Sequence, residues 1–188
     1  MTELINFVKY YCDLSPEELD LVIQKFVSRT VRKNQFLLKK GQTCNEFIYT
    51  ISGCFRHYLK NDKGAEITTW IVFDDMLATE LSSFVSGQPS KYYISALMDC
   101  EVMTISREEL YKFYQEIPVF QQFGRKIAEE IAIGAINRVV SHLNESAADR
   151  YQGLLEKSGY VQKIPLKYLA SFLGVTVSSL SRLRKLNR

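Results

Sequence analysis

Between residue 31 and about residue 105 the chain alternates short apolar runs with turn residues, and this pattern constrains the fold most. The runs are rich in β-branched and aromatic residues, which favour strands. Turn signals such as Lys40-Gly41, Ser52-Gly53 and Gly87-Gln88-Pro89 separate them. The predicted strands are Val31, Phe36–Leu38, Phe47–Ile51, Phe55–Leu59, Ile67–Phe73, Tyr92–Leu97 and Val102–Ile105. Many short strands joined by regular turns predict a β-sandwich or barrel.

Helical patterns lie on both sides of the predicted strands. Ser15, Pro16 and Glu18 provide an N-cap, a first-turn proline and a capping box. Ser106 and Glu109 form a second capping box. The predicted helices before the C-terminal segment span residues 13–29, 107–115, 119–144 and 146–157. Strands followed by helices give an α+β fold class.

The helix predicted over residues 119–144 has an apolar stripe along one face. Most steps between its apolar residues are three or four, as a helical face requires. The residues of the stripe are Phe120, Phe123, Ile127, Ile131, Ala135, Val139 and Leu143. The stripe can pair with its copy in a second chain or pack on its own β domain, and the two uses are compatible. We therefore predict three units, a β-rich domain over 1–118, a dimerisation helix over 119–144 and a C-terminal domain over 145–188.

The segment from Ile164 to Lys185 is typical of two short helices joined by a tight turn. Gly174 allows the left-handed conformation at the end of the first helix, and Thr176 can cap the second. Residues predicted to be buried are Leu166, Leu169, Ala170, Leu173, Val177, Leu180 and Leu183. The opposite side of the second helix presents Ser178, Arg182 and Lys185, flanked by Ser179 and Ser181. Small hydroxyls and an arginine suit a DNA groove, although an ordinary helical hairpin would show the same spacing.

Charge is distributed unevenly along the chain. The stretch from residue 157 to residue 188 holds seven basic residues and no acid. The net charge of the whole chain is +3, so the other 156 residues together carry a net charge of −4. A basic module on an acidic body favours nucleic-acid contact at the C-terminal end. The basic residues are Lys157, Lys163, Lys167, Arg182, Arg184, Lys185 and Arg188.

Several classes of protein fit the sequence poorly. No run of 18 apolar residues predicts a membrane span, and the N-terminus lacks a signal-peptide cleavage site, so we expect a cytoplasmic protein without membrane contact. Cys12, Cys44, Cys54 and Cys100 form no C-x-x-C motif and are expected to be reduced and mostly buried. With two histidines we expect no metal site. No nucleophile–base pair or phosphate loop indicates catalysis, so we expect no enzyme and no catalytic residue.

Two stretches resemble the Crp/Fnr family of dimeric regulators. FLLKKGQTCNEFIYTISGCFRHYLKNDKGAEIT is similar to the first half of the cyclic-nucleotide-binding β-roll, with Gly41 and Gly53 at its turn glycines. IPLKYLASFLGVTVSSLSRLRK resembles the family's DNA-binding signature, and the short members found in Bacteroidetes are the most alike. The resemblance implies a β-roll sensor, a dimer helix and a helix-turn-helix. Because the chain ends at Arg188, we expect no full wing after the second helix.

The resemblance also implies an effector pocket, in which this chain departs from the family pattern. Cyclic-AMP-binding members hold the ribose with a glutamate and the phosphate with an arginine. Here Glu80 is kept, whereas Thr79 replaces the preceding glycine and Ser90 stands at the arginine position, followed by Lys91. The predicted pocket residues are Glu80, Ser82, Ser83, Ser90, Lys91 and Tyr92. We expect no cofactor and an effector other than cyclic AMP, or a pocket filled by its own side chains.

By the resemblance, the protein is a sequence-specific transcription regulator. Its partners would be double-stranded DNA with an inverted repeat, a second copy of itself, and RNA polymerase if it activates transcription. The predicted DNA-contacting residues are Lys167, Thr176, Val177, Ser178, Ser179, Ser181, Arg182 and Lys185. The alternative is a β-roll ligand sensor or interaction module with little DNA binding.

Overall fold

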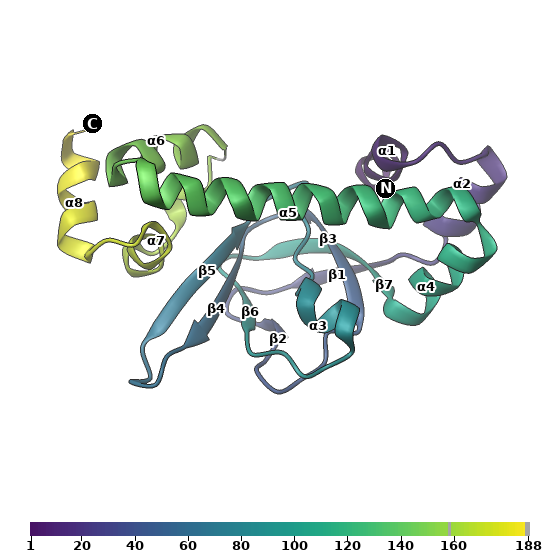
Figure 1. Cartoon of the computed structure of the whole chain (residues 1–188), viewed down its shortest axis with the longest axis horizontal. Coiled ribbons are helices and arrows are strands. Elements are labelled where there is room, and N and C mark those ends of the chain that lie inside the picture. The colour runs from purple at the N-terminus through teal and green to yellow at the C-terminus, as the bar shows by residue number, and fades with distance from the viewer. Residues whose placement is uncertain (158, 187–188) are drawn as a thin grey trace.

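The computed structural model describes residues 1–157 and 159–186, which form a β-roll, a long crossing helix and a cluster of C-terminal helices (Figure 1). The helices are α1 (Thr2–Tyr11), α2 (Pro16–Ile23), α3 (Leu81–Ser86), α4 (Arg107–Glu116), η1 (Pro118–Phe120), α5 (Gln121–Asn144), α6 (Ala147–Lys157), η2 (Val161–Lys163), α7 (Leu166–Leu173) and α8 (Val177–Leu186). The strands are β1 (Val27–Val31), β2 (Phe36–Leu38), β3 (Glu46–Ser52), β4 (Phe55–Lys60), β5 (Glu66–Val72), β6 (Tyr93–Ala96) and β7 (Cys100–Ser106).

The strands form two antiparallel sheets with a shared apolar core. One sheet has the order β1-β7-β3 and the other the order β2-β6-β4-β5. Phe55 on β4 is fully buried and pairs with Val72 on β5 and with Ala96 on β6. Ile48 and Val102 supply the core from the other sheet. The predicted α+β class with an N-terminal jelly-roll-like domain is therefore confirmed.

The N-terminal region differs from the prediction. The capping box at Ser15 and Glu18 is present, but α2 ends at Ile23, so the helix predicted over 13–29 is wrong beyond that point. Residues Val27–Val31 instead pair with β7 as strand β1, because the sheet edge offers them backbone hydrogen bonds. Helices α1 and α3 were not predicted at all.

Helix α5 crosses the whole β-roll, and its two halves meet different surroundings (Figure 1). Phe123 and Ile127 are buried in the core of the roll, as is Phe120 just before the helix. Beyond residue 131 the apolar side chains are exposed, among them Val139 and Leu143 of the stripe. The first half of the predicted stripe therefore packs on its own domain, and only the second half is free for a partner.

The C-terminal helices share a second apolar core with the β-roll. From the roll it receives Cys54, Ile71, Phe73 and Leu97. From the C-terminal helices it receives Tyr151, Leu154, Val161, Ile164, Leu169, Ala170, Leu173 and Leu180. The pair of helices α7 and α8 is thus packed directly on the β-roll.

The four cysteines are all buried free thiols, as predicted. Among the described residues, no helix combines the length and the apolar character that crossing a bilayer requires.

Candidate functional site: helix α8 and the cavity beneath α5

The C-terminal helix pair is built as its sequence predicts. Helix α7 ends at Gly174, whose φ of 71° lies in the left-handed region that glycine adopts freely. Thr176 then caps α8, because its Oγ1 accepts a hydrogen bond of 3.1 Å from the Ser179 amide. Ala170 and Leu180 are buried between the two helices and hold them in close contact.

The predicted DNA-contacting residues gather on the outer side of this unit. Ser178, Arg182 and Lys185 are exposed, and Ser179 and Ser181 beside them are half-buried. Thr176 and Val177 at the start of α8 and Lys167 on α7 are also exposed. Val177 keeps 47% of its surface, so the prediction that it belongs to the buried side is wrong. The exposed face of α8 is small, polar and cationic, without an acidic residue.

Two arginines of this region have an internal role that the sequence analysis did not foresee. Arg184 donates to the Val161 carbonyl at 3.3 Å. Arg150 on α6 donates at 3.0 Å to the Leu173 carbonyl, at the end of α7. A cation near exposed carbonyls at a helix C-terminus stabilises that end of the helix. Of the basic residues counted in the sequence, Arg188 lies outside the described residues, and the side chain of Lys157 is not described.

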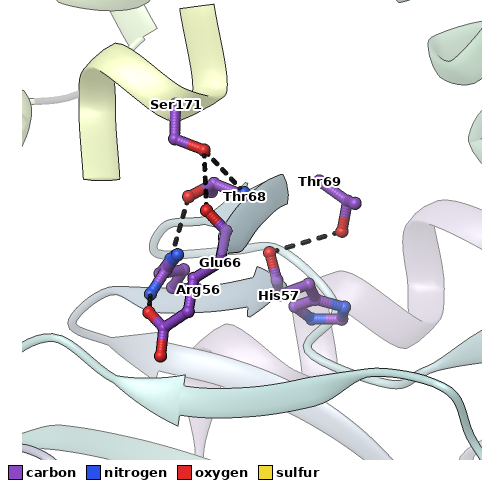
Figure 2. Close-up of polar contacts among 6 residues, drawn as sticks. All are labelled: Arg56, His57, Glu66, Thr68, Thr69 and Ser171. Carbon is purple, nitrogen blue, oxygen red and sulfur yellow. Dashed lines mark hydrogen bonds and ion pairs between the residues drawn. The ribbon is translucent and has the colours of Figure 1, made fainter. Parts of the chain in front are cut away.

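The helix-turn-helix docks on the hairpin of β4 and β5 through buried polar contacts (Figure 2). Arg56 is 2% exposed and donates to Thr68 Oγ1 at 2.9 Å and to a Glu66 carboxylate oxygen at 2.7 Å. Its guanidinium carbon lies 3.8 Å from the centroid of the Tyr168 ring on α7. Ser171, also on α7, accepts a hydrogen bond of 2.9 Å from the Thr68 amide. These contacts fix α7 against β5.

A second contact joins α5 to the same surface. The Arg138 guanidinium lies 4.0 Å from the Phe172 ring centroid and 5.5 Å from that of Trp70, and it donates to the Phe172 carbonyl at 3.3 Å. Burial lowers the pKa of Arg138 to about 10. Arg138 therefore links the long helix, the β-roll and α7.

The six predicted pocket residues do line one cavity, of about 720 Å³. They are Glu80, Ser82, Ser83, Ser90, Lys91 and Tyr92. The cavity lies between α3 with its flanking segments, β5 and the middle of α5. Ligand cavities commonly measure about 300–1,000 Å³, so a small molecule fits this one.

The polar groups at the expected phosphate site are already used within the chain. Glu80 caps α3 by accepting from the amides of Ser82 and Ser83, at 3.0 and 3.1 Å. Ser90 is 4% exposed, and its Oγ accepts from the Tyr92 amide at 3.0 Å. Lys91 is exposed to solvent. A cyclic phosphate would meet no arginine among the described residues that line the cavity, and the Ser82 and Ser83 amides are already taken by Glu80, so these residues do not fit a cyclic nucleotide.

Sequence reasoning missed the rest of the cavity wall. His57 on β4 and Trp70 on β5 line it, and Ile131 and Gly134 reach it from α5. A period-two strand pattern marks half of the β5 side chains as inward, but it does not reveal that α5 closes the opening. Among the described residues, no group of three or more potential ligands gathers as a metal site would require.

Comparison with known proteins identifies the family of the β-roll and the fold of the chain. Residues 28–117 match the family profile of the cyclic nucleotide-binding domain. By sequence, no curated protein matches the chain.

Several solved structures share the fold over most of the chain. FixK2 from Bradyrhizobium japonicum has a TM-score of 0.73 at 13% identity, covering 86% of this chain and 83% of that one. A protein from Eubacterium rectale described as a transcriptional regulator of the Crp/Fnr family has a TM-score of 0.71 at 18% identity, covering 93% and 83%. The c-di-GMP-responsive global regulator CLP of Xanthomonas campestris has a TM-score of 0.65 at 15% identity, covering 92% of each chain. At these identities the likeness establishes the fold.

Proposed function

We propose that this chain, which has the Crp/Fnr fold with a cyclic nucleotide-binding domain at residues 28–117, is a homodimeric, sequence-specific DNA-binding transcription regulator. The observation that carries the proposal is the outer face of α8. It presents Ser178, Arg182 and Lys185 to solvent, while Leu180 on the opposite side is fully buried. A helix with this distribution can enter a major groove without exposing its core.

The two cationic residues of that face would have different tasks. Arg182 lies in the middle of the face, and a guanidinium can donate two hydrogen bonds to the O6 and N7 atoms of guanine. Lys185 on α8 and Lys167 on α7 would bind phosphates, which fix position without reading sequence. Thr176 and Ser179 at the N-terminus of α8 would add phosphate contacts, and Val177 and Ser181 would line the contact.

The second half of α5 would provide the dimer contact. Its exposed apolar residues need a partner, and a second copy of the same helix supplies one by two-fold symmetry. Such a dimer sets two recognition helices about 34 Å apart, so the operator would be an inverted repeat. The regulator would act in the cytoplasm, and on RNA polymerase if it activates transcription.

The cavity would be the effector site, and the docking contacts support a path from it to α7. Trp70 lines the cavity and also stacks near Arg138, which holds Phe172. Thr69 lines the cavity beside Thr68, which donates to Ser171. A ligand that moved β5 would therefore disturb the surface on which the helix-turn-helix rests.

Binding-site selection from random DNA duplexes tests the proposal. The wild type should enrich an inverted repeat, and Arg182→Ala should lose preference at one base pair of each half-site, with affinity reduced by about 1–3 kcal/mol. Arg125→Ala is the matched control, because Arg125 is an exposed arginine on α5 whose partner is Glu129. Failure to enrich an inverted repeat, or the same motif with equal affinity for Arg182→Ala, would reject α8 as the reader.

A further inference from the structure

The sensor cavity holds more acidic than basic side chains. Among the described residues that line it, Asp75, Glu80 and Glu130 are acidic, and Lys91 is the one lysine or arginine. Glu130 accepts a hydrogen bond of 2.6 Å from the Tyr11 hydroxyl, and Glu80 is held by two amides. An anionic ligand would be placed among these carboxylates with a solvated ammonium as its only counter-charge, and like charges disfavour such binding.

The remaining wall is largely apolar and comes from four parts of the chain. Phe7 on α1, Trp70 on β5, Met76 and Leu77 before α3, and Ile127 and Ile131 on α5 line the cavity. Such a wall binds the apolar surface of a ligand by removing it from water.

His57 adds a directional hydrogen-bonding group. His57 lines the cavity and is 8% exposed, and its Nε2 is buried without a hydrogen-bond partner in the described part of the chain. Burial lowers the pKa of His57 to about 4, so the ring is neutral at pH 7. A backbone hydrogen bond at Ala78 acts on the same ring. We assign the proton of the neutral ring to Nδ1, which leaves Nε2 as the acceptor. A buried acceptor without a donor is unfavourable. Nε2 is shielded from solvent in the structure, so a ligand in the cavity provides the donor when the His57 ring turns toward it.

We propose that the cavity binds a small neutral molecule that is largely apolar and carries one hydroxyl or N–H group, which donates to His57 Nε2. The proposal rests on the proposed function in so far as this cavity is the effector site. The ligand class that it names differs from the cyclic nucleotides after which the matched domain is named.

Three fluorescent probes with the same ring system test the ligand class on the full chain. N-phenyl-1-naphthylamine is neutral and has one N–H group. 8-Anilino-1-naphthalenesulfonate adds a negative charge, and N-methyl-N-phenyl-1-naphthylamine lacks the N–H. In fluorescence titrations the first probe should bind with one site per chain, and the sulfonate roughly tenfold or more weakly. The N-methyl probe should bind about threefold to tenfold more weakly, as the loss of one hydrogen bond predicts.

Variants of the chain test whether the probe binds in this cavity and whether His57 accepts its hydrogen bond. Ser82→Trp fills the cavity from α3 and should abolish binding of the neutral probe, because Ser82 lines the cavity and is exposed. Val85→Trp is the matched control on the same helix, since Val85 is exposed and outside the cavity wall. In His57→Phe the difference between the N–H and N-methyl probes should disappear.

The outcomes separate this inference from the regulator assignment. Equal or tighter binding of the sulfonate, no binding of the neutral probe, or its displacement by micromolar cyclic AMP would overturn the inference. So would equal loss of binding in the Ser82 and Val85 variants, or an N-methyl effect that persists without His57. None of these results alters selection of an inverted repeat by α8, and failure of that selection leaves the probe results unchanged.

Discussion

Replacing Ile136 with glutamate should convert the proposed dimer to a monomer. Ile133, Ile136, Val140 and Leu143 follow the alternating three- and four-residue spacing of a coiled-coil seam on α5. They are 57%, 62%, 47% and 78% exposed in the single chain. Complete burial of such a side chain contributes about 1.5–3 kcal/mol, so roughly 1–2 kcal/mol remains to be gained by each.

The seam as a whole sets the strength of the dimer. Eight side chains from two copies would contribute on the order of 8–16 kcal/mol, which is comparable with the cost of about 4–15 kcal/mol for bringing two chains together. Ile136→Glu removes two of the eight and places two carboxylates against each other. We expect the dimer to weaken by about 3 kcal/mol or more, which is at least roughly 100-fold in the dissociation constant.

Light scattering after gel filtration measures the effect directly. The wild type should have about twice the chain mass of 21.7 kDa, and Ile136→Glu a mass near that of one chain. Val85→Glu is the control, because Val85 is 55% exposed but lies on α3, away from the seam. A wild-type protein that stays at the mass of one chain at tens of micromolar would refute the reasoning. An unchanged dimer in Ile136→Glu would place the contact elsewhere.

Three further predictions follow from the docking and cavity geometry. Ser171→Ala should weaken the contact between α7 and β5 by about 1 kcal/mol and speed hydrogen exchange of the Thr68 amide about fivefold, whereas Ser178→Ala should leave that amide unchanged. Replacement of Lys185 by Ala should weaken binding to all DNA sequences alike and reduce the slope of affinity against salt by about one unit, and a change confined to one sequence would contradict this. Because the pKa of His57 is lowered from 6.5 to about 4 in the fold, protonation favours unfolding, so stability should fall from pH 6.5 down to pH 4. The loss attributable to His57 is on the order of 3 kcal/mol, and urea titrations of His57→Phe should show a correspondingly smaller decline.

The sequence predicted the elements whose signals are local. Ser15, Ser106 and Thr176 were identified as caps from residue type and spacing, and each accepts an amide hydrogen bond. The full capping box is present at Ser15 and Glu18, whereas at Ser106 and Glu109 the bond to the Ser106 hydroxyl is the one that the structure shows. Gly174 was identified by its position between two apolar faces, and it has the left-handed conformation. Such features depend on residues within one helical turn, which a single sequence displays.

Features that depend on distant partners were harder to predict. Val27–Val31 looked like the end of a helix until β7 supplied the hydrogen bonds of a sheet. The stripe on α5 could not be divided from its spacing alone, because Ile127 and Val139 are both apolar members of it, and only what covers them makes one buried and the other exposed. The cavity residues of α3 and its flanks were predicted from family resemblance, whereas His57 and Trp70 became visible only when α5 and the β-roll were placed together.

Some arginines near the C-terminal end bind carbonyl groups within the chain, so a count of basic residues overstates the charge available to DNA. Arg182 and Arg184 are two positions apart on α8, which is about 200° around the helix axis. If Arg182 faces DNA, Arg184 must face inward, and its hydrogen bond to the Val161 carbonyl agrees with this. Arg150, outside the basic stretch, is also used internally, because it donates to the Glu145 and Leu173 carbonyls at the C-terminal ends of α5 and α7. The positive charge available to DNA is therefore smaller than the sequence total, and binding should depend more on the few residues of the α8 face than on overall charge.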